Sequence, residues 1–148
     1  MTDSLVVFTK SPATLAGMAY PPRDLDWRAL RDRGIALVIR LHRGRDYEPS
    51  PLRFHDAPLQ DLIGGVSPTD SVAEAERVWT AARVTADAVA GGEGVVVHCC
   101  GGTGRTGTVV ACALRLLGRS ADEAIATVEA QRPTWPESTW QLDVVRSG

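Results

Sequence analysis

The chain has 148 residues, of which 44% are hydrophobic and 23% charged, a composition typical of one globular domain spanning residues 1–148. Its formal net charge of −2 provides no general attraction to nucleic acid or to an anionic membrane surface. Three cysteines make no disulfide framework, no apolar run reaches the roughly 20 residues of a membrane span, and the first residues lack the basic region of a signal peptide. We therefore expect a cytoplasmic protein, monomeric, that binds neither nucleic acid nor membranes.

The amino-terminal third predicts two strands and one helix. Residues 5–8 form a short apolar run typical of an edge strand, and residues 15–22 are interpreted as a turn leading into a helix. Asp24 is a suitable N-cap for that helix and Gly34 would end it. The nearly continuous apolar run at 35–39 then predicts a buried strand of a partly parallel sheet.

A strand, a loop and a long helix follow. Residues 52–56 predict a further strand, bounded by prolines, and residues 58–68 predict a loop. Apolar residues at spacings of three and four predict a helix over 71–90, which Gly91 and Gly92 would end. The apolar face of this helix would consist of Val72, Ala75, Trp79, Ala82, Ala86 and Val89.

The remaining chain predicts one strand and three helices. A β-branched run at 95–98 predicts a strand, and the helix expected over 106–117 is apolar around most of its circumference. A capping box at 120–123 opens the next helix, and the last one would begin at 136. Together these elements predict an α/β fold, with a central mixed or mostly parallel sheet of four to five strands flanked by helices. The helices at 71–90 and 106–117 would lie on opposite sides of that sheet.

A glycine-rich loop connects the last predicted strand to the apolar helix. Cys99 stands at the end of the strand and Arg105 at the start of the helix, with five residues between them. Glycine at 101, 102 and 104 would let the backbone take positive φ angles, so that its N–H groups converge on an oxyanion at the positive end of the helix dipole. The same field favours the thiolate form of Cys99, and the guanidinium of Arg105 can contact two phosphate oxygens. A nucleophile and an anion site therefore converge on one phosphoryl group.

The string His-Cys-x5-Arg-Thr at residues 98–106 resembles the signature of the cysteine-dependent protein phosphatases, in particular the small dual-specificity and kinase-associated phosphatase branch. The resemblance implies hydrolysis of phosphotyrosine, with phosphoserine and phosphothreonine as alternatives, in a phosphoprotein or phosphopeptide through a phosphocysteine on Cys99. It further implies that Thr106 hydrogen-bonds the sulfur, that His98 orders the loop and that no cofactor is needed. The phosphate oxygens would be bound by Arg105 and by the backbone N–H groups of Cys100, Gly101, Gly102, Thr103 and Gly104.

In this family an aspartate upstream of the nucleophile gives a proton to the leaving oxygen, and the candidates here are Asp61, Asp56 and Asp70. Asp61 is favoured because residues 58–68 are similar to the family's Pro-Ile-x-Asp-Gly-Gly-x-Pro. Two additional residues, Leu62 and Ile63, separate this aspartate from the glycines. Asp70 directly precedes the long predicted helix, where it would serve as an N-cap.

Three other interpretations of the loop compete with this one. Residues 102–107 also fit G-x-G-x-x-G, which would indicate a nicotinamide-dependent oxidoreductase, although few residues follow and they have helical periodicity. A structural glycine turn beside an inert buried cysteine is a second interpretation. A catalytically weak phosphopeptide-binding module is the third.

Several other polar residues have less direct predicted roles. Cys100 could resolve an oxidised Cys99, but adjacent cysteines form a strained ring, so a role limited to its backbone is favoured. Cys112 is expected to pack in the core, and Gln141, although it could position water, is expected to face solvent. No metal site is expected, because the three histidines are scattered without ligand-like spacing: His42, His55 and His98.

Overall fold

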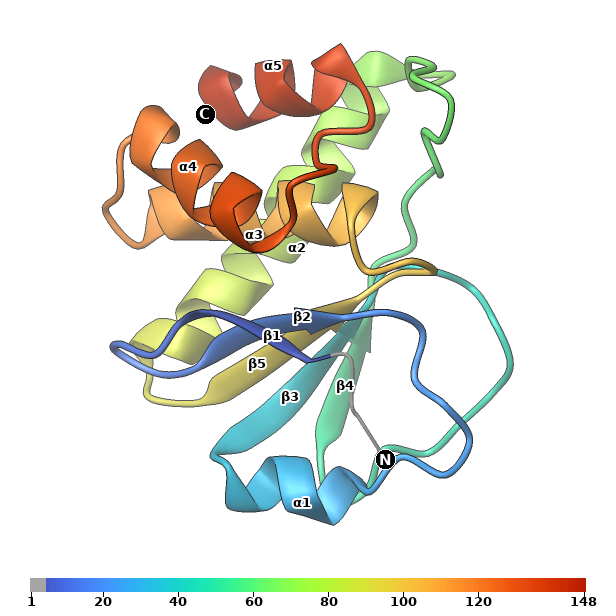
Figure 1. The fold of residues 1–148 in the computed structure, drawn as a ribbon, viewed down its shortest axis with the longest axis vertical. Helices are drawn as coiled ribbons and strands as arrows, with labels where there is room; N and C mark the ends of the chain where they lie inside the picture. The colour runs from blue at the N-terminus through green and yellow to red at the C-terminus, as the bar shows by residue number, and fades with distance from the viewer. Residues whose placement is uncertain (1–4) are drawn as a thin grey trace.

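Residues 5–148 are described by the computed structural model, and they form a five-stranded sheet with helices on both faces (Figure 1). The strand order is β1-β2-β5-β3-β4, with β1 antiparallel to β2 and all other neighbours parallel. The strands are β1 (Val6–Thr9), β2 (Leu15–Met18), β3 (Ile35–Arg40), β4 (Arg53–Asp56) and β5 (Gly94–His98). The predicted α/β class, with its mixed and mostly parallel sheet, is confirmed.

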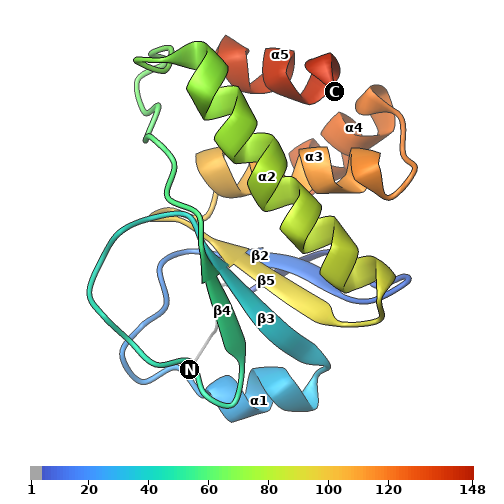
Figure 2. The same ribbon diagram turned by 180° about the vertical axis from the view of Figure 1, so that it is seen from behind.

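The helices divide unequally between the two faces of the sheet (Figures 1 and 2). The larger core includes Val95 and Val97 of β5 and is covered by α2 (Ser71–Ala90), α3 (Gly104–Leu116), α4 (Ala121–Gln131) and α5 (Thr139–Ser147). The short helix α1 (Trp27–Asp32) covers the other face, where Val96 belongs to a smaller core.

The expected placement of the helices at 71–90 and 106–117 on opposite sides of the sheet is wrong. Both lie on the same face, and α2 crosses in front of α3 in Figure 2. The physical reason is that α3 is buried on all sides from Gly104 to Leu114. The sheet can cover only one side of this helix, so other helices must cover the rest. Packing α3 between the sheet and the other helices removes its whole apolar circumference from water.

β2 is a strand where a turn leading into a helix was predicted. All four of its residues are buried, and it pairs with β1 on one edge and β5 on the other. Alanine and glycine have low strand propensity, so only the pairing on both edges and burial on both faces make this segment a strand. Gly17 is required here because a β-carbon would lie 2.7 Å from Thr106 Cγ2 of α3.

Helix α3 begins at Gly104, two residues before its predicted start, and the starts of α1 and α5 also differ from the prediction. Asp26, and not Asp24, caps α1, since its side chain accepts a hydrogen bond from the backbone N–H of Ala29 at 3.1 Å. Helix α5 begins at Thr139 and not at Pro136, because the side chain of Ser138 serves as its N-cap. For α1 and α5 a neighbouring polar side chain with the right backbone geometry provides the cap.

The buried face of α2 also differs from the predicted one. Val72 is 74% exposed, whereas Glu74, Val78 and Ala81 are buried. The first turns of α2 extend beyond the sheet (Figure 2), so an apolar residue there has no strand to pack against.

Candidate active site

The connection between β5 and α3 presents a set of unpaired backbone N–H groups. Within residues 5–148, the N–H groups of residues 100–103 donate to no acceptor, and Thr103 makes no side-chain cap at the start of α3. Two carbonyl groups of the same loop, in contrast, accept hydrogen bonds. Tyr20 N–H donates to Cys100 O at 2.9 Å, and Arg132 Nε donates to Gly102 O at 3.0 Å. Free N–H groups at a helix N-terminus form an anion site.

The glycines of this loop serve different purposes from those predicted. Gly102 alone of the three has a positive φ, +76°, so this backbone geometry is absent at Gly101 and Gly104. Gly104 instead lies against the carboxylate end of the Glu137 side chain, which would have to move to admit a β-carbon there.

Cys99 lies at the base of the loop with its side chain directed to α3. The residue is 2% exposed, and the Thr106 hydroxyl donates a hydrogen bond to its Sγ at 3.2 Å. The contact predicted between Thr106 and the sulfur is therefore present in the structure. A hydroxyl donor at this distance can stabilise the negative charge of a thiolate.

His98 is fully buried beneath the loop. Its Nε2 lies 2.5 Å from the Tyr47 hydroxyl, and its Nδ1 lies 3.3 Å from the backbone carbonyl of Cys99. Because a carbonyl can only accept, Nδ1 carries the proton and Nε2 accepts from Tyr47. Burial lowers the pKa of His98 to about 4, so the ring is neutral and joins the end of β5 to the loop between β3 and β4.

Arg105 contacts two other loops from the first turn of α3. Its Nη1 lies 3.1 Å from His42 Nδ1 and donates to Leu59 O at 3.2 Å, and its Nη2 donates to Asp61 Oδ2 at 3.4 Å. The side chain is only 7% exposed. The guanidinium therefore stands where three segments meet: the loop at 99–105 between β5 and α3, called the phosphate loop below, the β3–β4 connection and the loop at 58–68.

The three candidate acids occupy different surroundings. Asp61 lies beside Arg105, and its side chain is 46% exposed, as a group that meets substrate must be. Asp56 forms two hydrogen bonds with Arg40, of 2.5 and 2.9 Å, and these hold the pKa of its carboxyl below its usual range. Asp70 caps α2 by accepting from the backbone N–H of Ala73 at 3.1 Å. Only Asp61 is brought to the phosphate loop.

The loop that carries Asp61 is fastened to α2 by a buried carboxylate. Glu74 accepts a hydrogen bond from the backbone N–H of Gln60 at 2.7 Å, and its other oxygen pairs with Arg77. The Gln60 side chain in turn accepts from Thr69 N–H at 2.9 Å. Glu74 was not predicted from the sequence, because a charged residue on a helix is usually exposed.

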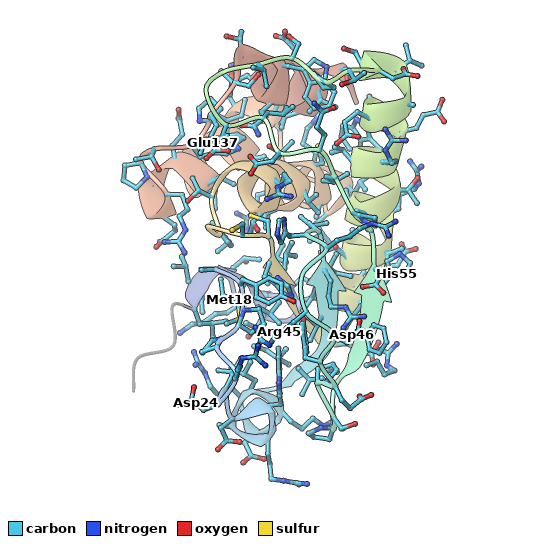
Figure 3. The ribbon with its side chains drawn as sticks, turned by 90° about the vertical axis from the view of Figure 1, so that its right-hand side faces the viewer. Met18, Asp24, Arg45, Asp46, His55 and Glu137 are labelled. Carbon is cyan, nitrogen blue, oxygen red and sulfur yellow. The ribbon has the colours of Figure 1, made fainter. Side chains whose placement is uncertain are left out.

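Glu137 and Gln141 are further polar residues of the site. Glu137 lies in the connection before α5 (Figure 3), against Gly104 of the phosphate loop. Burial raises the pKa of the Glu137 carboxyl, and the charge of Asp61 raises it further. Gln141 is 1% exposed and its side-chain oxygen accepts from Glu137 N–H at 2.8 Å, so the expectation that it faces solvent is wrong.

The remaining cysteines differ in exposure. Cys100 is exposed at the surface of the loop, and Cys112 is buried in α3. Burial raises the pKa of the Cys112 thiol, so it stays neutral and its predicted packing role is confirmed.

Among residues 5–148, no group of three or more His, Cys, Asp or Glu side chains could hold a metal ion. In the same residues, no helix has the length and apolar character needed to cross a membrane. The G-x-G-x-x-G segment leads into α3, and only helices follow it. A dinucleotide-binding fold needs further strands after this point, so the oxidoreductase interpretation is not favoured.

Two comparisons of sequence identify relatives. The family described as PTP-SAK, Swiss Army Knife protein, DSP-PTPase phosphatase domain, matches residues 9–142. A segment of 53 residues is 47% identical to protein tyrosine phosphatase domain-containing protein 1 of Danio rerio. That segment covers 35% of this chain and 7% of the Danio rerio protein, so the chain corresponds to a small part of this curated relative.

Solved structures share the fold over nearly the whole chain. Tk-PTP in its active form is 24% identical, with a TM-score of 0.74, and the match covers 99% of this chain and 97% of that one. Kinase associated phosphatase with its catalytic-site cysteine replaced by serine is 17% identical, with a TM-score of 0.72 over 99% of this chain and 94% of that one. The resemblance to the small dual-specificity phosphatases is thereby confirmed, and the chain belongs to the PTP-SAK family of dual-specificity-type phosphatase domains.

Proposed function

We propose that this chain is a cysteine-dependent phosphomonoesterase that hydrolyses phosphotyrosine in proteins or peptides, and also phosphoserine and phosphothreonine. One observation carries the proposal: Cys99, whose sulfur accepts a hydrogen bond from Thr106 at 3.2 Å, is followed by a loop whose N–H groups at residues 100–103 have no acceptor among residues 5–148, and then by Arg105 in the first turn of α3. We further propose that the protein acts as a cytoplasmic monomer. We propose that it needs no cofactor, as the family resemblance implies, and no metal, as the spacing of its histidines indicates.

In the first step the Cys99 thiolate attacks phosphorus opposite the leaving oxygen, so that an S–P bond forms as the P–O bond breaks. The backbone N–H groups of residues 100–105 and the Arg105 guanidinium stabilise the three equatorial oxygens. Asp61 gives its proton to the leaving oxygen.

In the second step water attacks the phosphocysteine and the S–P bond breaks. Asp61, now ionised, accepts a proton from that water. The hydroxyl of Thr106 donates to the sulfur as it regains its negative charge. Glu137 and Gln141 both lie against Gly104, and we propose that the buried amide of Gln141 orients the water.

The composition of the loop at 100–104 supports a preference for phosphoproteins over inositol phosphates. Residues 100–104 contain no lysine or arginine that could meet the additional phosphates of an inositol ring. Rates on phosphotyrosine and phosphothreonine peptides and on inositol phosphates would test this preference, with the highest kcat/KM expected on phosphotyrosine.

The activity is tested with p-nitrophenyl phosphate. The wild-type chain is expected to release p-nitrophenol in a burst followed by steady turnover, and Cys99→Ser to abolish both phases. Binding of phosphopeptide without turnover by the wild type would instead indicate the phosphopeptide-binding module. Turnover that survives Cys99→Ser would exclude a phosphocysteine intermediate.

A further inference from the structure

Both N–H groups of Arg105 Nη1 have acceptors outside the phosphate loop. One acceptor is His42 Nδ1 at 3.1 Å, in the connection between β3 and β4, and the other is Leu59 O at 3.2 Å. A guanidinium nitrogen of this kind carries two hydrogens, so this end of the side chain has no donor left for a substrate.

The opposite edge of the guanidinium is the one left for phosphate. In an arginine side chain, Nη2 lies on the same side as the Nε–H group, and these two nitrogens form a fork that can contact two oxygens. Nη2 makes only a 3.4 Å contact with Asp61, and Nε donates to no acceptor within residues 5–148. The pair of acceptors on Nη1 thus leaves the Nε–Nη2 edge of Arg105 as the one available to a phosphate bound at residues 99–105.

His42 can hold Arg105 in only one of its forms. A guanidinium only donates hydrogen bonds, so Nδ1 of His42 must carry no proton and Nε2 must carry it. The ring is held in place by Tyr20, whose ring it meets edge-on with the two centroids 6.0 Å apart. The Tyr20 hydroxyl is itself anchored, since it donates to Arg45 O at 2.8 Å.

We propose that His42 is a positioning residue for phosphate binding, which holds Nη1 of Arg105 so that the Nε and Nη2 groups face the phosphate. This inference rests on the proposed function, because it assigns the phosphate to the phosphate loop beside Arg105. The carbonyl of Leu59 is the second acceptor, and being backbone it cannot be removed by substitution. His42 is therefore the one of these two acceptors that a substitution can remove.

Two substitutions separate an acceptor role from a structural one. His42→Leu removes the acceptor, whereas His42→Asn places an amide oxygen near the position of Nδ1. Inorganic phosphate binding to each variant is measured by titration in a Cys99→Ser background, which needs no turnover, and kcat/KM on p-nitrophenyl phosphate is measured with Cys99 intact. His42→Leu is expected to weaken both by about tenfold to a hundredfold, the effect of a hydrogen bond to a charged group, and His42→Asn to restore most of the loss.

The matched control is His55 on β4 (Figure 3), which is not among the hydrogen-bond partners of Arg105. His55→Leu and His55→Asn should leave phosphate binding unchanged. Unchanged phosphate binding in His42→Leu, or equal loss in His42→Leu and His42→Asn, would overturn the proposal. If the wild type binds phosphate but hydrolyses no ester, the proposed function fails while the binding results still decide the role of His42.

The protonated nitrogen of His42 can also be identified in the wild-type protein, so this test does not depend on whether the variants fold. Long-range ¹H–¹⁵N spectra of the three histidine rings report which nitrogen carries the proton. The neutral His42 ring is expected to carry it on Nε2. A proton on Nδ1 in the neutral ring would contradict the hydrogen bond to Arg105.

Discussion

Gly17 of β2 lies directly against Thr106 of α3, so closely that a β-carbon at residue 17 would be 2.7 Å from Thr106 Cγ2. The same β-carbon would lie 2.9 Å from Cε2 of Phe8. Because the Thr106 hydroxyl is hydrogen-bonded to the Cys99 sulfur, the backbone of β2 determines how close this hydroxyl comes to the nucleophile. The four residues of β2, which carry no recognisable motif, thus position the Thr106 hydroxyl against the Cys99 sulfur.

Gly17→Ala should therefore impair both stability and catalysis. The added methyl must displace Thr106 or Phe8, and inserting a methyl into a packed core typically costs about 1–3 kcal/mol of unfolding free energy. Denaturant unfolding measures this loss, and the rate of phosphocysteine hydrolysis measures the displacement of Thr106. Gly91→Ala is the control, since a β-carbon there meets backbone oxygens only at 3.4 and 3.5 Å. Wild-type values for both quantities in Gly17→Ala would contradict the prediction.

Thr106→Val should slow the second chemical step more than the first. Valine keeps the shape of the side chain but removes the donor that stabilises the departing thiolate. Loss of a hydrogen bond to a charged group costs about 1.5–3 kcal/mol, so steady turnover should fall by about tenfold to a hundredfold. The burst of p-nitrophenol should remain, since the phosphocysteine accumulates. A variant in which burst and steady phase slow equally would place the role of the hydroxyl in the first step.

Asp61→Asn should reduce turnover of esters with poor leaving groups by about 10²–10⁴-fold and remove the alkaline limb of the pH–rate profile. Esters with good leaving groups need less proton transfer and should be affected less. Asp56→Asn and Glu137→Gln are the comparison variants under the same conditions. If Asp56→Asn produces the effect, the assignment of the loop at 58–68 is wrong. If Glu137→Gln does, the carboxyl against Gly104 is the proton donor.

Arg105→Lys should keep the positive charge and still lose most of the activity. An ammonium group cannot form the paired contact with two phosphate oxygens, and its three donors cannot serve those oxygens in addition to His42, Leu59 and Asp61, which the guanidinium contacts. The measurement is kcat/KM on p-nitrophenyl phosphate, together with unfolding to verify that the fold is retained. A lysine variant with nearly wild-type kcat/KM would show that charge alone suffices.

The buried His98 should make the protein less stable in acid. Burial lowers its pKa from the ordinary value of 6.5 to about 4, so between these values the unfolded chain binds a proton that the folded chain does not. Stability therefore falls as pH is lowered from about 6.5 to about 4, by up to about 3 kcal/mol for this group. Unfolding free energies of wild type and His98→Asn across this range measure the contribution, with His55→Asn as the control. An equally steep loss in His98→Asn would assign the acid sensitivity to other groups.

The sequence alone determined the features that depend on neighbouring residues. The strand at 95–98, the glycine-rich loop and the apolar helix after it follow from local pattern, and the spacing of Cys99 and Arg105 identified the chemistry. The capping box at Ser120 is also local, and it is present in the structure. In each case the residues concerned lie within a few positions of one another, so a short window of the sequence contains the information.

The tertiary structure alone decided what depends on contacts between distant segments. It made a strand of Leu15–Met18, placed α2 and α3 on one face of the sheet and buried Gln141 beneath the site. It also brought His42 and Glu137 to the phosphate loop, from connections with no chemical pattern of their own. The physical reason is that burial and close approach are properties of the packed chain: a carboxylate against Gly104, or an imidazole on Arg105, is set by how separate elements meet.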